Sequence, residues 1–218
     1  MQQGSSAISA DQKSCAFCER AHFAPNILKE TTNFHIVADH APLVEGHILI
    51  IPKTHYRCYG DTPANLDTEL FTLKKEVARF FQHYYAPIIF WEHGVFHQTV
   101  FHAHLHCFPF GDVTYDLSQN LHKHMVEDQN DIRAWFQHQG HYFYLEDAQH
   151  AMIFPPEPEP YMRIIQEVLR PGVVRRSQGH TQWRPVAQRI EEGKALIQST
   201  IAHWHTFEQQ EQEAGYAH

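Results

Sequence analysis

Short apolar runs and one long amphipathic segment alternate along the first half of the chain. Two runs rich in Ile and Val flank a loop that holds a proline and a glycine, so they are predicted to be paired strands. Apolar residues then recur at three- and four-residue steps, which predicts an amphipathic helix. The predicted elements are, in order, strands at 34–38 and 47–51, a helix from Asp61 to the residue before Pro87, and strands at 88–92 and 99–108.

The second half has a less regular pattern. Its predicted elements are a helix at 116–138, a hairpin of 141–145 with 148–154, an extended connector at 155–160, and helices at 161–169 and 185–207. This order predicts an α+β fold, in which an antiparallel sheet of about five strands packs against the long amphipathic helix. The expected organisation is a loose tail at 1–14, a folded domain at 15–112 and a mostly helical C-terminal extension at 113–218.

Composition removes several classes of protein. The chain has 218 residues, 43% of them hydrophobic, and a net charge of −8 with histidine neutral. A packed core is therefore feasible, whereas a nucleic-acid polymer is not an expected partner because its backbone requires a basic face. The sequence contains no apolar run of about 18 residues and no secretory start, so we expect no membrane partner and a cytoplasmic location.

Histidine is the unusual residue, with 20 copies. Three of them alternate with apolar residues as His102, His104 and His106. On a strand, this spacing places the three imidazoles on one face, about 7 Å apart, where they could flank one bound group. The alternative is an edge strand whose solvent-exposed face happens to carry histidine.

Two of the four cysteines lie close together, in the segment Cys15-Ala16-Phe17-Cys18. In a chain without an export signal this spacing is typical of half a zinc site. A redox pair or two buried thiols are the alternatives that the spacing leaves open.

These motifs together resemble the histidine triad (HIT) superfamily of nucleotide hydrolases and transferases. Residues 102–108 match the alternating histidine motif, and 46–55 look like the glycine-histidine strand that ends in Pro-Lys-x-x-His, here one residue shorter. Asp39 with Pro42 resembles the loop before that strand. Residues 98–100 stand where the family often has Gly-Gln-Ser-Val, with His97 in place of the glycine. The resemblance spans about half of the chain, and its four motifs occur in the family's order.

The resemblance implies a role for each matching residue. His104 corresponds to the nucleophile that attacks an α-phosphorus, and His106 to the residue that contacts phosphate oxygens and assists the leaving group. His47 matches a fourth active-site histidine, Asp39 the acceptor of ribose hydrogen bonds, and Gln98 a residue of the phosphate loop.

The phosphate loop departs from the family pattern, because the turn before it contains Glu92-His93-Gly94. This turn resembles a mostly microbial branch with a C-terminal extension. His93 is therefore a candidate phosphate contact, and a solvated loop histidine is the alternative.

Family members with an N-terminal C-x-x-C hold a zinc ion, and all four matching positions are present as Cys15, Cys18, His55 and His102. Two thiolates and two imidazoles close a tetrahedral shell, so the implied zinc is structural.

The expected function is a hydrolase that cleaves a dinucleoside polyphosphate or a nucleoside phosphoramidate at the α-phosphorus, through a nucleotidyl-histidine intermediate. Transferase branches of the superfamily carry glutamine at the third triad position, so His106 favours hydrolysis over a nucleotidyltransferase or phosphorylase. A nucleotide-binding module without turnover is the third alternative. A homodimer is one assembly that the resemblance leaves open.

Overall fold

One antiparallel sheet of eight strands runs through the computed structural model, which describes residues 15–117, 121–177 and 184–215. The strands are β1 (Ile27–Glu30), β2 (Phe34–Ala38), β3 (Ile48–Pro52), β4 (Ile89–Glu92), β5 (Leu105–Phe108), β6 (His124–Met125), β7 (Phe143–Glu146) and β8 (Ala151–Phe154). Their order across the sheet is β1-β2-β3-β5-β4-β7-β8-β6. The predicted tail at 1–14 lies outside the described residues.

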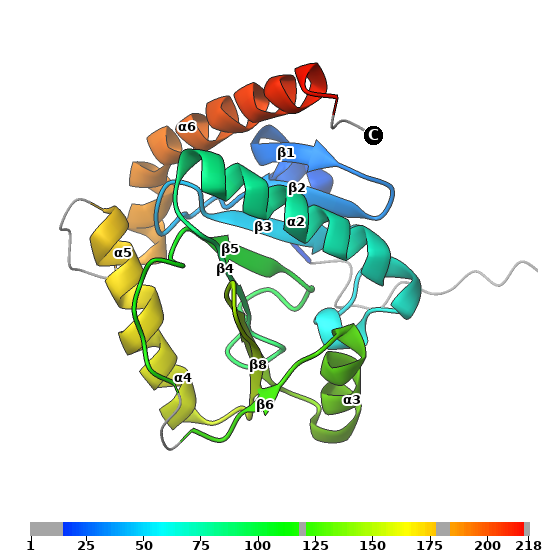
Figure 1. The fold of residues 1–218 in the computed structure, drawn as a ribbon. Helices are drawn as coiled ribbons and strands as arrows, with labels where there is room; N and C mark the ends of the chain where they lie inside the picture. The colour runs from blue at the N-terminus through cyan, green and yellow to red at the C-terminus, as the bar shows by residue number, and fades with distance from the viewer. Residues whose placement is uncertain (1–14, 118–120, 178–183, 216–218) are drawn as a thin grey trace, which may run out of the picture.

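Helices cover the sheet on both sides (Figure 1). The α-helices are α2 (Asp67–Tyr84), α3 (Gln129–Gln139), α4 (Pro158–Ile164), α5 (Arg170–Arg176) and α6 (Val186–Glu213). Short 3-10 turns are η1 (Arg20–His22), η2 (Ala24–Asn26), η3 (Tyr59–Asp61) and η4 (Ala64–Leu66), and one π-helical turn, η5 (Ile165–Leu169), joins α4 to α5. The α+β class is as predicted, and none of the described helices is long and apolar enough to cross a membrane.

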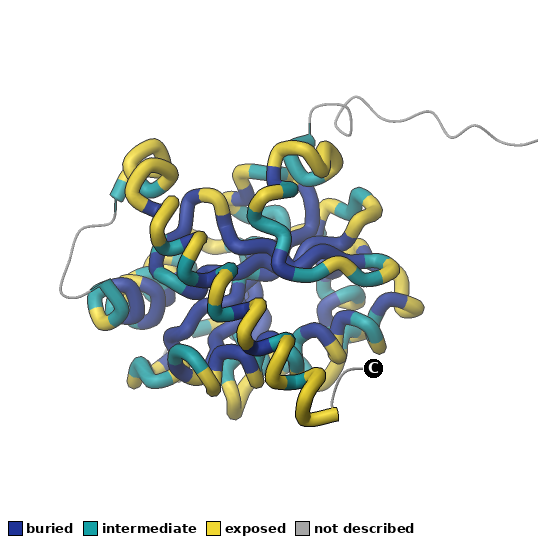
Figure 2. The backbone as a smooth tube through the Cα atoms, turned by 90° about the horizontal axis from the view of Figure 1, so that it is seen from above, coloured by how far each residue is buried: buried dark blue, intermediate teal, exposed yellow. Residues whose placement is uncertain are grey.

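The largest core lies on the side of the sheet that α2 covers. Alternate residues of β2 and β3, such as Ile36 and Ile50, point to this side and pack on Val77 and Phe80 of the apolar stripe of α2. Because strand side chains alternate between faces, their sequence neighbours point to the opposite side. On that side lie two smaller apolar clusters, one against α4 and α5 and one near the N-terminal segment. The central strands are buried, whereas the outer side of α6 is exposed (Figure 2).

The sheet has more strands than the sequence predicts, because the extension adds its own hairpin to it. β7 pairs with the outer edge of β4 through Phe90–Glu146, Trp91–Leu145 and Glu92–Tyr144. This edge of β4 is therefore occupied within the chain, and the outermost described strands are β1 and β6.

Several predicted elements have different bounds, among them the helix predicted from Asp61, which begins at Asp67. The strand predicted at 99–108 is formed only at 105–108, because the N–H of Ala103 donates to the carbonyl of Tyr56 outside the sheet. The helix predicted at 116–138 is wrong over its first half, where 124–125 pair with β8 instead. The connector predicted at 155–160 already contains the first turn of α4, which accepts a proline because its N–H groups need no helical partner.

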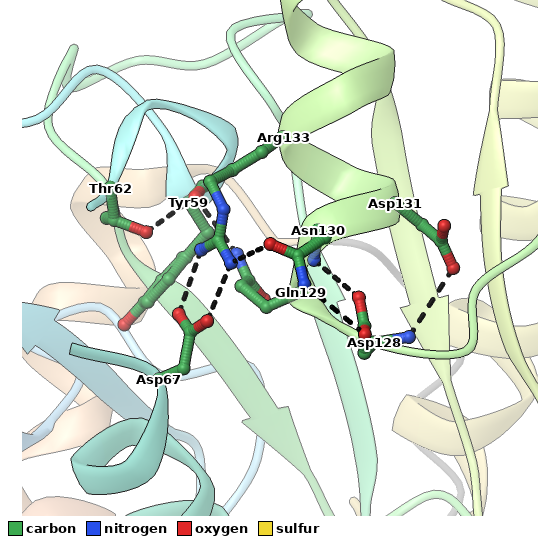
Figure 3. Close-up of polar contacts among 8 residues, drawn as sticks. All are labelled: Tyr59, Thr62, Asp67, Asp128, Gln129, Asn130, Asp131 and Arg133. Carbon is green, nitrogen blue, oxygen red and sulfur yellow. Dashed lines mark hydrogen bonds and ion pairs between the residues drawn. The ribbon is translucent and has the colours of Figure 1, made fainter. Parts of the chain in front are cut away.

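Helix α3 starts where its sequence supplies a capping box. The Asp128 carboxylate accepts from the N–H of Asn130, and the Asp131 side chain accepts from the N–H of Asp128. Arg133 then forms two hydrogen bonds of 2.8 and 2.6 Å with Asp67 at the start of α2 (Figure 3). This ion pair joins the extension to the first half of the chain.

Candidate active site and metal cluster

A cavity of about 340 Å³ opens on the face of the sheet opposite α2. Cross-strand pairing builds its floor, since His106 lies between Leu49 of β3 and Trp91 of β4. The residues around it come from both halves of the chain: Phe17, Asp39, His40, Ala41, Leu43, His47, Leu49, Trp91, His93, His97, Thr99, Val100, His104, His106, Phe108, Tyr161, Ile165, Leu169, Val186 and Arg189.

His104 has one ring nitrogen fixed by the backbone. Its Nδ1 lies 2.6 Å from the carbonyl oxygen of His102, which can only accept, so Nδ1 carries the proton. Nε2 is then a bare lone pair in a ring that lines the cavity. Burial lowers the pKa of His104, which favours this neutral form. The arrangement suits a nucleophile.

His106 has the opposite tautomer. The N–H of Leu43 donates to Nδ1 of His47 over 3.3 Å, so the proton of neutral His47 is on Nε2. That Nε2 lies 2.9 Å from Nδ1 of His106, which therefore accepts and leaves the N–H of His106 at Nε2. The two neighbouring rings, His104 and His106, are 4.9 Å apart between centroids and present an acceptor and a donor to one cavity.

Asp39 lies beside this pair. One carboxylate oxygen accepts from the N–H of Ala41 at 2.7 Å, and the other is 3.5 Å from Nε2 of His47. Asp39 is thus held at the cavity wall, at the position where the resemblance implies a ribose contact.

His93 lines the cavity, as a contact residue would. Its Nδ1 donates to the carbonyl of Phe96 over 3.1 Å, and its ring packs edge-on against His106. Burial lowers the pKa of His93 to about 4. At neutral pH His93 is therefore uncharged, and it would meet a ligand as a neutral imidazole.

Gln98 holds the backbone rather than facing the cavity, which differs from its expected phosphate contact. Its Oε1 accepts from the N–H of Val95, and its Nε2 donates to the carbonyls of His102 and Arg57. Both amide hydrogens are used. Val95 has a φ of 76°, a strained value for a β-branched residue, and the bond to Gln98 stabilises that turn.

The four predicted metal ligands converge at a separate point. Sγ of Cys15, Sγ of Cys18 and one ring nitrogen each of His55 and His102 all lie within 4.8 Å of one another. Three of the four sulfur–nitrogen distances among them are 3.2, 3.5 and 3.5 Å. Zinc–sulfur and zinc–nitrogen bonds of usual length give a tetrahedral edge of about 3.5 Å, so the cluster is compatible with zinc.

Second contacts orient this cluster and link it to the cavity. Nε2 of His102 donates to the carbonyl of Pro52 at 2.7 Å, which leaves Nδ1 bare and directed at both sulfurs. The carbonyl of the same residue holds His104. Phe17, between the cysteines, packs edge-on against both His102 and His104.

Sequence reasoning missed the residues that the extension adds to the cavity. Tyr161 precedes the π-helical turn, and Arg189 lies in the first turn of α6. Neither belongs to a motif, and nothing local in the sequence marks them. The docking of the extension brings Tyr161 against His93 and His97, and Arg189 close to Asp39.

Comparison with known proteins assigns the first half of the chain to a family. The HIT domain family model matches residues 22–112. Residues 22–112, about two fifths of the chain, are therefore a HIT domain.

Two curated relatives and one solved structure are similar to this part. An uncharacterised HIT-like protein of Mycoplasma genitalium is 28% identical over 116 residues, which are 50% of this chain and 82% of that protein. The adenosine 5′-monophosphoramidase HNT1 of Saccharomyces cerevisiae is 30% identical over 100 residues, which are 45% of this chain and 63% of the yeast protein. The chain thus spans less than two thirds of the yeast protein's length. The solved structure is a zinc-bound histidine triad family protein from Mycobacterium smegmatis, which is 28% identical to this chain. The alignment covers 58% of this chain and 96% of that protein, with a TM-score of 0.39.

Proposed function

We propose that the protein hydrolyses a nucleoside phosphate derivative at the α-phosphorus, through a nucleotidyl intermediate on His104. Dinucleoside polyphosphates and nucleoside phosphoramidates are the substrate classes, and the similarity to a monophosphoramidase supports the second. One observation carries the proposal. Nδ1 of His104 is tied to the carbonyl of His102, so its bare Nε2 shares a cavity with the Nε2–H of His106.

Two steps follow from these tautomers. Nε2 of His104 forms a bond to phosphorus while the bond to the leaving group breaks, and the carbonyl of His102 stabilises the positive charge that develops on the ring. With substrate bound, the His47–His106 pair carries one proton more than the two neutral rings hold. His106 passes this extra proton to the leaving group. The negative charge of a bound phosphate favours that protonation.

In the second step water attacks phosphorus and the bond to His104 breaks. The proton of the water returns to His106, so the pair regains its starting charge. The products are a nucleoside monophosphate and the protonated leaving group. Asp39 would accept hydrogen bonds from the ribose, and Gln98 would keep the turn before His102 in place.

We also propose that Cys15, Cys18, His55 and His102 hold a structural zinc ion. The donors are two sulfurs and two imidazole nitrogens, the usual ligands of zinc in sites without an open position. When bound, the ion would fix the N-terminal segment, and Phe17 with it, against the residues that orient His104.

The proposed hydrolysis is tested with a substrate panel and a His104→Ala variant. The parent protein is incubated with dinucleoside polyphosphates and adenylate phosphoramidates, with and without inorganic phosphate, and products are separated by chromatography. We expect nucleoside monophosphate without added phosphate, and a loss of kcat of about 10³-fold or more in His104→Ala with nucleotide affinity nearly unchanged. His138→Asn, an exposed substitution on α3, serves as the control and should match the parent.

The other outcomes distinguish the alternatives. Nucleoside diphosphate formed only when phosphate is present would indicate a phosphorylase. Nucleotide binding without any product would indicate a binding module. Activity of His104→Ala close to that of the parent would remove His104 from the role of nucleophile.

A further inference from the structure

Arg189 brings a positive charge from the extension to the wall of the HIT cavity. It lies in the first turn of α6, outside the matched domain, and its Nη1 donates to the carbonyl of Ala41 at 2.6 Å. Ala41 belongs to the loop that also holds Asp39, because its N–H binds that carboxylate. Arg189 therefore reaches the side of the cavity formed by Asp39 and His47.

The guanidinium of Arg189 has no carboxylate partner within 4.0 Å among the described residues. Every other arginine in the described ranges either forms an ion pair or, as with Arg170, is exposed to solvent. Arg189 is half-buried, and its Nε is buried without a hydrogen-bond partner. Burying an unpaired cation is unfavourable, so this arrangement requires a compensating group.

No neighbouring side chain in the described ranges supplies that group. Asp39 favours the charged form of Arg189 through space, but its two oxygens face the N–H of Ala41 and Nε2 of His47. An anion in the cavity could accept from the free donors of Arg189, and phosphate matches the fork of a guanidinium.

The other residues around the cavity offer little positive charge to a bound phosphate. Of the described residues that line the cavity, Arg189 is the one arginine or lysine. His47 and His93 have pKa values lowered to about 4 by burial, so they carry no charge at neutral pH. A nucleotide phosphate that enters this cavity would find a permanent positive charge at Arg189.

We propose that Arg189 binds a phosphate group of the nucleotide ligand, so that the C-terminal extension completes the binding site of the HIT domain. The inference rests on the proposed function for the class of ligand, a nucleoside phosphate. It goes beyond that function by assigning to α6 a residue that distinguishes phosphorylated from unphosphorylated nucleosides. The bond to Ala41 fixes the side chain at the same time.

The test compares the binding of nucleotides and nucleosides by calorimetric titration. The parent protein, Arg189→Gln, Arg189→Lys and the control Arg170→Gln are titrated with adenosine and guanosine 5′-monophosphates, with the two nucleosides, and with inorganic pyrophosphate. We expect Arg189→Gln to weaken nucleotide binding by about 10- to 100-fold, as for the loss of a charged hydrogen bond. Nucleoside binding should change by less than about 3-fold, Arg189→Lys should recover part of the loss, and Arg170→Gln should bind as the parent does.

Three results would overturn the assignment of Arg189. An equal loss for nucleotide and nucleoside would mean that Arg189 only supports the loop at Ala41. Unchanged nucleotide binding in Arg189→Gln, or no binding of any phosphorylated probe by the parent, would exclude a phosphate contact. Because the titrations need no turnover, a parent that binds nucleotides through Arg189 but hydrolyses nothing would refute the proposed hydrolysis alone.

Discussion

The orientation of single imidazole rings decides what each histidine of the site can do. In His102, Nε2 donates to the carbonyl of Pro52, and Nδ1 is left for the sulfurs of Cys15 and Cys18. In His104 the arrangement is reversed, with Nδ1 as the donor and Nε2 free. The two histidines are two residues apart in the sequence, yet the ring of His102 faces the two cysteines and the ring of His104 lines the cavity.

The donor set of Cys15, Cys18, His55 and His102 is suited to a cation. Burial, together with a hydrogen bond and repulsion from the neighbouring Cys15, raises the pKa of Cys18 to about 11. Two thiolates at this spacing repel each other unless a positive ion lies between them. The proposed zinc would supply that charge.

At the scale of these residues we predict one equivalent of zinc in the purified protein. The double substitution Cys15→Ser with Cys18→Ser removes both sulfur ligands, so the metal should be lost and Tm should fall by several degrees. Metal content is measured by elemental analysis, and unfolding by calorimetry. Glu19→Gln, an exposed change in the same segment, is the control and should keep the metal. A parent protein that contains no metal after growth with zinc would contradict the prediction.

The placement of the motif residues could be predicted because it depends on local backbone geometry and on the pairing of adjacent strands. His104 depends on the carbonyl two residues before it, and His47 meets His106 because their strands are adjacent. Arg189 could not be predicted, since its place depends on how a helix 148 residues away meets Ala41. The contacts of Gln98 could not be predicted for a similar reason, because its partners include a carbonyl of a distant loop.

At the scale of elements, α6 links the cavity to the main core. Its first turn carries Arg189, and its later turns bury Trp204 and Phe207 against Phe80 of α2. Between these points, Thr200 accepts the N–H of Gly46 at 3.0 Å. The sequence predicted a helix at 185–207, but not the loop on which it docks.

Gly193 sets how closely α6 approaches the loop that carries Asp39. A Cβ at this position would lie 2.5 Å from Cδ of Pro42, whose rigid ring cannot rotate away. We expect Gly193→Ala to lower the free energy of unfolding by about 1–2 kcal/mol, because overpacking outweighs the gain of about 1 kcal/mol in helix propensity. Nucleotide affinity should fall with it, since Asp39 and Arg189 both depend on this contact.

Urea unfolding and calorimetric titration measure the two effects of Gly193→Ala. Gln209→Ala on the exposed side of α6 is the matched control, and it should change stability by less than about 0.5 kcal/mol. A Gly193→Ala protein that is more stable than the parent and binds nucleotide equally well would show that this contact does not position the loop.

At the scale of the whole molecule, a buried carboxyl group connects the two halves of the chain. Glu92 of β4 accepts from the N–H of Tyr59 at 2.7 Å and from the hydroxyl of Tyr142, in the extension, at 2.6 Å. That hydroxyl in turn accepts the N–H of Gly60. The continuous sheet and this network indicate that the HIT domain and its extension unfold together.

Burial raises the pKa of Glu92 to about 7, although the hydrogen bonds from Tyr142 and Tyr59 favour the carboxylate. Its pKa in the unfolded chain is about 4.3, so the folded state holds the proton more tightly. The stability that protonated Glu92 contributes is complete below about pH 4 and is lost as pH rises through 7.

Between pH 5 and 8 the free energy of unfolding of the parent should therefore fall by roughly 3 kcal/mol relative to that of Glu92→Gln, which cannot ionise. Buried histidines such as His47 add their own pH dependence to both proteins, so the difference between the two urea-unfolding profiles isolates Glu92. Parallel profiles would mean that Glu92 titrates normally, and that the network between the two halves does not desolvate it.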